Sequence, residues 1–279
     1  METWTDLGGI EVRSLIVSRF RLDGGAMFGQ VPKPLWARYT KADAQNRIPL
    51  VVRALAVRRP ETTLLIEAGM GSNFMPKEIE RLEVEAPEGD LARALSGAGI
   101  DPSEVEHLIL THLHFDHAAG VGGEEGVQLP RARVYVQREH WERARTPGLK
   151  ERGSFRPQDL DLIESMPLTL VDGEAEILPG IRVRASDGHT RGMQTVEIIG
   201  DADRVTYASD LIPTLAHVRA AYTMGYDGWP EKLVEEKEAL LAEIARTGGM
   251  LVFVHDPDTA ACRIQHGSGG FSVRTKEEL

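Results

Sequence analysis

The sequence predicts an α/β fold, because strand-like and helix-like segments alternate along a chain that no linker divides. The chain has 279 residues, and 42% of them are hydrophobic. That length is enough for one large core or two small ones. Because the composition does not shift along the chain, we expect one domain over residues 1–279.

The first part of the chain predicts strands around a long connection. Apolar and polar residues alternate over residues 9–22, which predicts a strand. Residues 49–58 and 63–69 predict two further strands joined by a turn. Between them, residues 23–46 are apolar and punctuated by Gly and Pro. A connection of this kind is either a lid over a binding site or an ordered surface crossing.

Helices and strands then alternate to the end of the chain. Predicted helices cover residues 89–98, 138–145 and 230–246, and predicted strands cover residues 107–111, 132–137, 168–171, 175–178, 181–186, 194–199, 204–208 and 250–254. The last helix starts with Pro230, carries an apolar stripe and stops at Gly248. Residues 260–265 are expected to add a strand, and the tail after Gly267 to be loose.

Charge and cysteine content narrow the function classes. The net charge of −11 disfavours a nucleic-acid partner, which needs a basic face. Cys262 is the single cysteine, so no intrachain disulfide can form, and we expect it to be buried. The sequence shows neither a signal peptide nor an apolar run of transmembrane length. We therefore expect a soluble cytoplasmic protein with no membrane partner; a homodimer is compatible with the sequence.

The segment 111–120 carries the strongest functional signal. It places His112, His114, Asp116 and His117 within six residues, directly after a strand-like run. Residues two apart share a face in an extended segment, so the first two histidines can reach one ion together. Once the chain turns helical, Asp116 and His117 point in a new direction and can serve a second ion. The cluster predicts a metal site rather than a coincidental polar loop.

Three later motifs extend this signal into a family resemblance. Residues 187–190 read DGHT, Asp210 follows a predicted strand, and His255 follows another. With HLHFDH fitting the signature HxHxDH, the chain resembles the metallo-β-lactamase-fold hydrolases. The resemblance implies a four-layer αββα sandwich of two mixed β-sheets flanked by helices. It also implies one ion held by His112, His114 and His189, a second held by Asp116, His117 and His255, and Asp210 bridging the two.

The implied ligands are nitrogen and oxygen donors. They suit two divalent transition-metal ions, with zinc first and iron, cobalt, nickel or manganese also compatible. Two such ions can share a water and lower its pKa, and Asp116 or Asp210 can relay its proton. Glu67 stands where relatives usually carry Asp and is expected to orient a ligand histidine. Met193 replaces a histidine found in many relatives, and His140 is expected to be a surface or packing residue.

The motifs also favour one branch of the family. Flavodiiron proteins resemble HxExD, whereas His114 takes that Glu position here, and many β-lactamases carry Cys where Asp210 stands. Only a short segment follows His255, unlike in hydroxyacylglutathione hydrolases. The stretches MFGQVPKPLW at 27–36 and SDLIPTLAH at 209–217 look like the branch of acyl-homoserine-lactone lactonases and methyl-parathion-hydrolase-like enzymes.

This resemblance predicts a lactonase or esterase for small apolar substrates, with phosphotriesters as side substrates. A thioester or phosphoester hydrolase and a non-catalytic metal-holding sensor are the alternatives. Residues 211–229 should form one wall of the pocket. Phe28 and Trp36 are candidates for contact with an acyl chain. His217 and Tyr222 are candidates for a hydrogen bond to the ester oxygen, or simply pack in the core.

Overall fold

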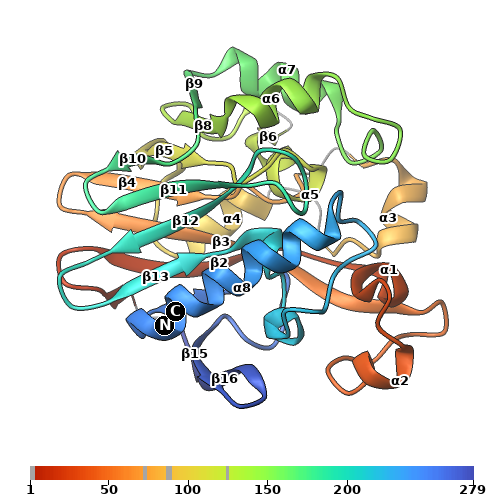
Figure 1. The fold of residues 1–279 in the computed structure, drawn as a ribbon. Helices are drawn as coiled ribbons and strands as arrows, with labels where there is room; N and C mark the ends of the chain where they lie inside the picture. Colours follow the sequence, from red (N-terminus) through yellow and green to blue (C-terminus); the bar gives the residue numbers. More distant parts are fainter. Residues whose placement is uncertain (1–3, 72–73, 86–89, 124–125) are drawn as a thin grey trace.

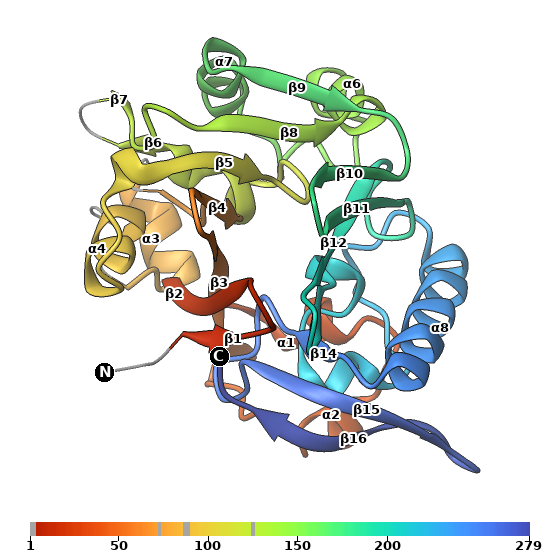
Figure 2. The same cartoon turned by 90° about the vertical axis from the view of Figure 1, so that its left-hand side faces the viewer.

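Two β-sheets lie face to face in the computed structural model, which describes residues 4–71, 74–85, 90–123 and 126–279 (Figure 2). The first sheet has the strand order β1 (Thr5–Asp6), β2 (Glu11–Asp23), β3 (Arg47–Arg59), β4 (Thr62–Ile66), β5 (Val105–Ile109), β8 (Arg133–Gln137) and β9 (Leu168–Val171). The second has the order β10 (Ala175–Leu178), β11 (Ile181–Ser186), β12 (Met193–Ile199), β13 (Arg204–Tyr207), β14 (Met250–Val252), β15 (Ala261–Gly267) and β16 (Gly270–Glu277). A small ribbon joins β6 (Gly122–Gly123) to β7 (Gly126–Val127).

Both sheets are mixed. In the first, β1 to β4 are antiparallel, whereas β4, β5, β8 and β9 run parallel. In the second, β13 and β14 form the parallel pair and the other neighbours are antiparallel. Chemistry-bearing loops collect at the carboxyl ends of such parallel strands.

Helices cover the outer faces of both sheets (Figures 1 and 2). On the side of the first sheet lie α3 (Pro76–Leu82), α4 (Asp90–Gly97), α6 (Arg138–Arg145) and α7 (Pro157–Ser165). Helix α8 (Pro230–Thr247) covers the second sheet, buries Leu233, Leu240, Leu241 and Ile244, and ends at Gly248 with φ 74°. This arrangement confirms the predicted αββα sandwich. Residue 89 of the predicted helix 89–98 lies outside the described residues.

Short helical turns complete the chain. They are α1 (Gly24–Phe28), α2 (Lys33–Trp36), α5 (Phe115–Ala118), η1 (Pro102–Glu104), η2 (Ala119–Val121), η3 (Ser209–Leu211) and η4 (Leu215–Val218). None of the helices in the described ranges has the length and apolar character needed to cross a membrane. Cys262 is buried, as predicted.

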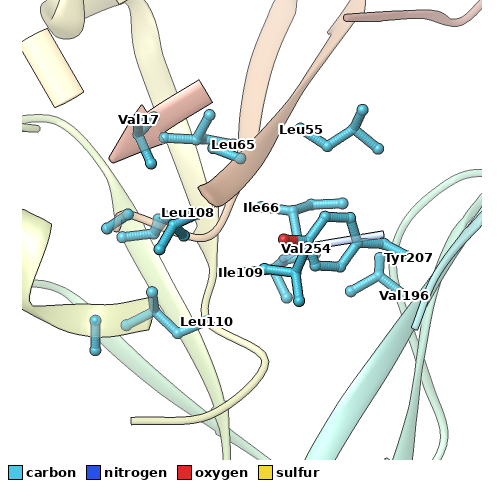
Figure 3. Packing of buried hydrophobic residues seen from close by; sticks show 14 of the residues in the cluster. Val17, Leu55, Leu65, Ile66, Leu108, Ile109, Leu110, Val196, Tyr207 and Val254 are labelled. Atoms are coloured by element: carbon cyan, nitrogen blue, oxygen red, sulfur yellow. The ribbon is translucent and has the colours of Figure 1, made fainter. Parts of the chain in front are cut away.

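The hydrophobic core fills the space between the two sheets (Figure 3). Leu55, Ile66 and Ile109 enter it from the first sheet, and Val196 and Tyr207 enter it from the second, all with at most 1% of their surface exposed. Tyr207 is buried up to its hydroxyl, which donates a hydrogen bond to the carbonyl oxygen of Arg53. This core fixes both sheets relative to each other and hence the loops at their shared edge.

One sequence prediction is corrected by the fold. The prediction of a loose tail after Gly267 is wrong, because β16 pairs with β15 from Gly267 opposite Gly270 to Ala261 opposite Glu277. The connection 23–46 has the form of the other alternative, an ordered crossing. Asp23 caps α1 by accepting a hydrogen bond from the N–H of Ala26, and Phe28 and Trp36 fold inward.

Candidate metal centre

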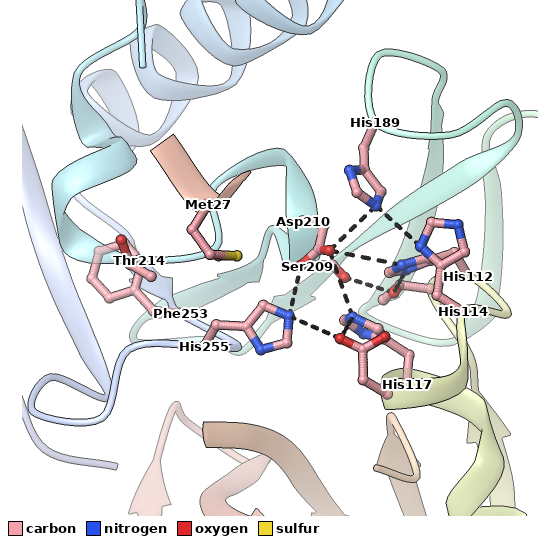
Figure 4. Close-up of polar contacts among 12 residues, drawn as sticks. Met27, His112, His114, His117, His189, Ser209, Asp210, Thr214, Phe253 and His255 are labelled. Atoms are coloured by element: carbon pink, nitrogen blue, oxygen red, sulfur yellow. Dashed lines mark hydrogen bonds and ion pairs between the residues drawn. The ribbon is translucent and has the colours of Figure 1, made fainter. Parts of the chain in front are cut away.

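The predicted ligands meet at the edge where strands of both sheets end (Figure 4). His112, His114, Asp116 and His117 follow β5, while His189 lies between β11 and β12. Asp210 follows β13, and His255 follows β14. Their side chains are nearly or fully buried, with at most 8% of each residue exposed. The polypeptide thus brings together residues that are up to 143 positions apart, from 112 to 255.

Asp210 lies at the centre of this group. Its Oδ2 is 3.3 Å from Nε2 of His189, 3.6 Å from Nε2 of His117 and 3.9 Å from Nε2 of His112. Its Oδ1 is 3.1 Å from Nε2 of His255. A carboxylate with histidines on both oxygens is placed to be shared between two ions.

The remaining donors divide into two sets. Ligand atoms of His112, His114 and His189 lie within 4.8 Å of one another, and so do those of Asp116, His117 and His255. These are the two sets that the family resemblance implies; a third group, Glu67 with His112 and His117, overlaps both and meets the same distance limit. His112 Nε2 and His117 Nε2 are buried and have no hydrogen-bond partner among the described residues. Buried polar atoms rarely stay unpaired, so this donor set fits bound cations.

The outward-facing ring nitrogens are fixed by hydrogen bonds. Nδ1 of His189 donates to Asp227 Oδ1 at 2.9 Å, and Nδ1 of His255 donates to the carbonyl oxygen of Val51 at 2.8 Å. Nδ1 of His117 lies 3.2 Å from Glu67 Oε1. Each bond fixes the ring orientation and leaves Nε2 facing the centre, as in the second coordination shell of known metal sites.

The buried environment sets the protonation of the ligands. Burial, helped by the neighbouring histidines, holds the pKa of His112 and of His114 well below the ordinary value, which keeps both imidazoles neutral. Burial raises the pKa of Asp210, but the charges of His255, His117 and His189 outweigh it and bring that pKa well below its usual range. Burial also lowers the pKa of His117 and His189, but the neighbouring carboxylates, Asp210 among them, outweigh it and raise both pKa values. Metal ligands must be deprotonated, so these two imidazoles would release a proton when a cation binds.

Glu67 braces the centre from the end of β4. Its Oε1 accepts a hydrogen bond from the hydroxyl of Thr111 and lies 3.4 Å from Oγ of Ser209, in addition to its contact with His117. The residue has φ 69°, which is uncommon for a side chain other than glycine. A single carboxylate therefore joins the ends of β4, β5 and β13, and its placement is consistent with the expected role in orienting a ligand histidine.

His140 is a packing residue, one of the two roles expected from the sequence, and Gly188 allows close packing beside His189. His140 is not at the surface: it is fully buried, accepts the N–H of Leu113 and donates to the carbonyl oxygen of Arg191, both at 2.8 Å. It thereby ties the first ligand segment to the His189 loop. Gly188 does not need a positive φ; a Cβ there would lie 2.3 Å from Cα of Leu233, so close packing against α8 requires the glycine.

A cavity of about 170 Å³ opens beside the ligands. The ligands in its wall are His114, Asp116, His189, Asp210 and His255, and the other wall residues are Leu22, Met27, Phe115, Lys150, Glu151, Ser154, Met224, Gly225 and Tyr226. The segment 211–229 contributes to the wall, as expected, through its later residues. Lys150 and Glu151 come from a polar stretch that had no functional signal in the sequence.

The four predicted substrate residues do not line this cavity. Phe28 has 1% of its surface exposed and stacks between Trp36, at 5.3 Å, and His217, at 5.1 Å. Both ring nitrogens of His217 are used, by Thr214 Oγ1 at 2.8 Å and the carbonyl oxygen of Met27 at 3.0 Å. Tyr222 packs edge-on against Phe28. These residues form an aromatic cluster behind Met27, because the apolar connection collapses into the core.

Comparison with known proteins agrees with this geometry. The sequence profile of the metallo-β-lactamase superfamily matches residues 47–260. The chain belongs to the metallo-β-lactamase superfamily. That family assignment rests on a match that includes strands β3 to β14 and every predicted ligand.

Curated relatives include lactonases. The chain is 30% identical over 189 residues to the N-acyl homoserine lactonase AttM of Azorhizobium caulinodans, covering 61% of this chain and 65% of that protein. It is 26% identical over 141 residues to the N-acyl homoserine lactonase AiiA of Bacillus thuringiensis subsp. kurstaki, covering 50% of each. The chain therefore spans between half and two thirds of the length of these two relatives.

Solved structures resemble the chain over its whole length. A probable metal-dependent hydrolase from Staphylococcus aureus superposes with a TM-score of 0.91 at 26% identity, covering 99% of each chain. The dizinc quorum-quenching lactonase AidC superposes with a TM-score of 0.84 at 17% identity, covering 100% of this chain and 98% of that one. The second likeness concerns the fold alone.

Proposed function

We propose that this protein is a dinuclear metal-dependent hydrolase that opens lactones or cleaves small apolar esters. The observation that carries the proposal is the division of buried donors into two sets around Asp210, beside a partly apolar cavity. Two divalent ions, zinc first among them, would be held by His112, His114 and His189 on one side and by Asp116, His117 and His255 on the other. When bound, such ions supply Lewis acidity and acidify a water molecule.

The protein's own residues have three tasks in this reaction. Asp116 and Asp210 both reach the cavity, so either carboxylate can accept the proton that the attacking water loses. Leu22, Met27 and Met224 offer an apolar wall for the non-reacting part of the substrate. Burial of the whole site excludes bulk water, which strengthens the electrostatic interactions within it.

The relatives support a lactone as the substrate, since two of them are named N-acyl homoserine lactonases. A thioester or phosphoester hydrolase is the alternative within the superfamily, and phosphotriesters are proposed side substrates. A non-catalytic metal-holding sensor is the alternative outside enzymes. The cavity favours turnover, because a storage or sensor site has no need for an open wall next to the ions.

The test is a substrate panel on the zinc-loaded protein, containing lactones, aryl esters, thioesters, phosphotriesters and β-lactams. We expect lactones and aryl esters to be turned over best. The variant Asp210→Asn should lose activity by roughly a hundredfold or more, because it removes the carboxylate proposed to be shared by the two ions and to accept the proton of the attacking water. Asp201→Asn, an exposed aspartate in a hairpin turn, is the matched control. Turnover of none of these substrates, or full activity in Asp210→Asn, would refute the proposal.

A further inference from the structure

A lysine is buried on α8, behind the candidate metal centre. Lys237 has no exposed surface, and its Nζ donates a hydrogen bond to the carbonyl oxygen of Tyr222 at 2.6 Å. Burial lowers the pKa of Lys237 to about 8, and the charge of Asp227 acts against that shift. Burying an ammonium group is costly unless an opposite charge compensates it. A buried ammonium at this position therefore needs an opposite charge nearby, and its burial needs a structural explanation.

Asp227 supplies an opposite charge that raises the pKa of Lys237 against the effect of burial, and it contacts a candidate ligand directly. It is 2% exposed, and its Oδ1 accepts the hydrogen bond from Nδ1 of His189 at 2.9 Å. Its Oδ2 accepts the N–H of Met224 at 2.7 Å. One buried carboxylate thus connects the ligand to the segment 222–229, which also forms part of the cavity wall.

The His189 loop is held between this segment and α8. On one side, the N–H of Gly228 donates to the carbonyl oxygen of His189 at 2.7 Å, and the N–H of Trp229 donates to that of Gly188 at 2.9 Å. On the other side, Glu236 of α8 accepts hydrogen bonds from the N–H groups of Asp187 and Gly188, each at 3.1 Å. Lys237 follows Glu236 and ties α8 to the start of the segment.

We propose that Lys237 is a positioning residue for the metal centre: its buried ammonium holds segment 222–229, and with it the Asp227 carboxylate, where Asp227 orients His189. The inference rests on the proposed function only in taking His189 as a metal ligand. Removing the ammonium breaks the tie to Tyr222 and takes the compensating charge away from Asp227. The His189 ring then loses its fixed orientation while the other ligands keep theirs.

The experiment compares zinc affinity, measured by competition with a chromophoric chelator, in Lys237→Met, Asp227→Asn and the double variant. We expect Lys237→Met to weaken zinc binding about tenfold, as for other residues that orient ligands. Because Lys237 acts through Asp227, the double variant should bind zinc no more weakly than Asp227→Asn alone. Lys237→Gln, which keeps an N–H donor but removes the charge, should show the same loss and serves if the methionine variant does not fold.

A control and a metal-free measurement make the result decisive. Leu241→Ala removes a buried side chain one turn further along α8, so it should lower the melting temperature without changing zinc affinity. In the metal-free protein, Lys237→Met should speed hydrogen exchange at the amides of Met224 and Gly228. The exchange measurement tests the role of Lys237 even if the wild-type protein binds no zinc. Failure of the wild-type protein to bind zinc would refute the proposed function, not this inference. Zinc affinity within about twofold of wild type, losses that add in the double variant, or unchanged exchange would overturn the inference.

Discussion

At the scale of single residues, the candidate ligands of segment 111–120 could be predicted because their signal is local, whereas His189, Asp210 and His255 followed from the family resemblance. His112, His114 and His117 stand close together directly after an apolar run, so their spacing alone indicates a metal site. The roles of His140 and Asp227 were not predictable, because both residues act through long-range hydrogen bonds. No short pattern in the sequence specifies such a partner. Of the residues that contact the candidate ligands from outside, the sequence therefore indicated Glu67, through the family resemblance, but not Asp227.

Glu67 offers a test at this scale. Its carboxylate contacts Thr111, His117 and Ser209 together from a backbone with φ 69°. Glu67→Asp shortens the side chain by one methylene, so it should lose part of this set and weaken zinc binding by about 10–100-fold. Chelator competition gives the affinity, and circular dichroism checks the fold. Exposed Glu61→Asp is the matched control. Unchanged affinity in Glu67→Asp would show that Glu67 does not orient His117.

At the scale of elements, periodic segments were predicted well and collapsed segments were not. Helix α8 and strands β9 to β13 carry their own hydrophobic pattern and turn residues, so their position followed from the sequence. The pairing of β16 with β15 and the folding of residues 23–46 into α1 and α2 depend on tertiary contacts. The sequence pattern of an apolar connection is the same whether the connection covers a substrate or packs into the core. Here Phe28 and Trp36 pack into the core.

This difference leads to a prediction about α1 and the cavity wall. Phe28→Ala should reduce the free energy of unfolding by about 3–5 kcal/mol, because it removes a buried aromatic ring from a stacked cluster. Phe28→Ala should leave the preference among acyl-chain lengths unchanged.

Met224→Ala, in contrast, removes a side chain from the cavity wall. It should shift kcat/KM toward larger esters, by about tenfold for one or two extra methylenes. Denaturant unfolding and a series of esters measure both effects. A changed chain-length preference in Phe28→Ala would show that Phe28 contacts the substrate after all.

At the scale of the whole molecule, the candidate centre joins the two sheets. His112, His114, Asp116 and His117 follow a strand of the first sheet, whereas His189, Asp210 and His255 belong to loops of the second. Each of the two donor sets takes members from both sheets. Bound ions would therefore link the two halves of the sandwich, in addition to the core between them.

Metal binding should accordingly stabilise the entire fold and saturate at two zinc ions per chain. The donors form a compact site in the folded state alone, so zinc at a free concentration of about 100 times its Kd should add about 2.7 kcal/mol to the free energy of unfolding for each site. Chelation should lower the melting temperature by about 2–4 °C for each kcal/mol lost. Elemental analysis gives the stoichiometry, and thermal unfolding with and without chelator gives the shift. Magnesium is the control, since it prefers oxygen ligands and should leave the melting temperature unchanged. A reproducible ratio of one zinc per chain would contradict the dinuclear centre, and an unchanged melting temperature would show that the ions do not link the sheets.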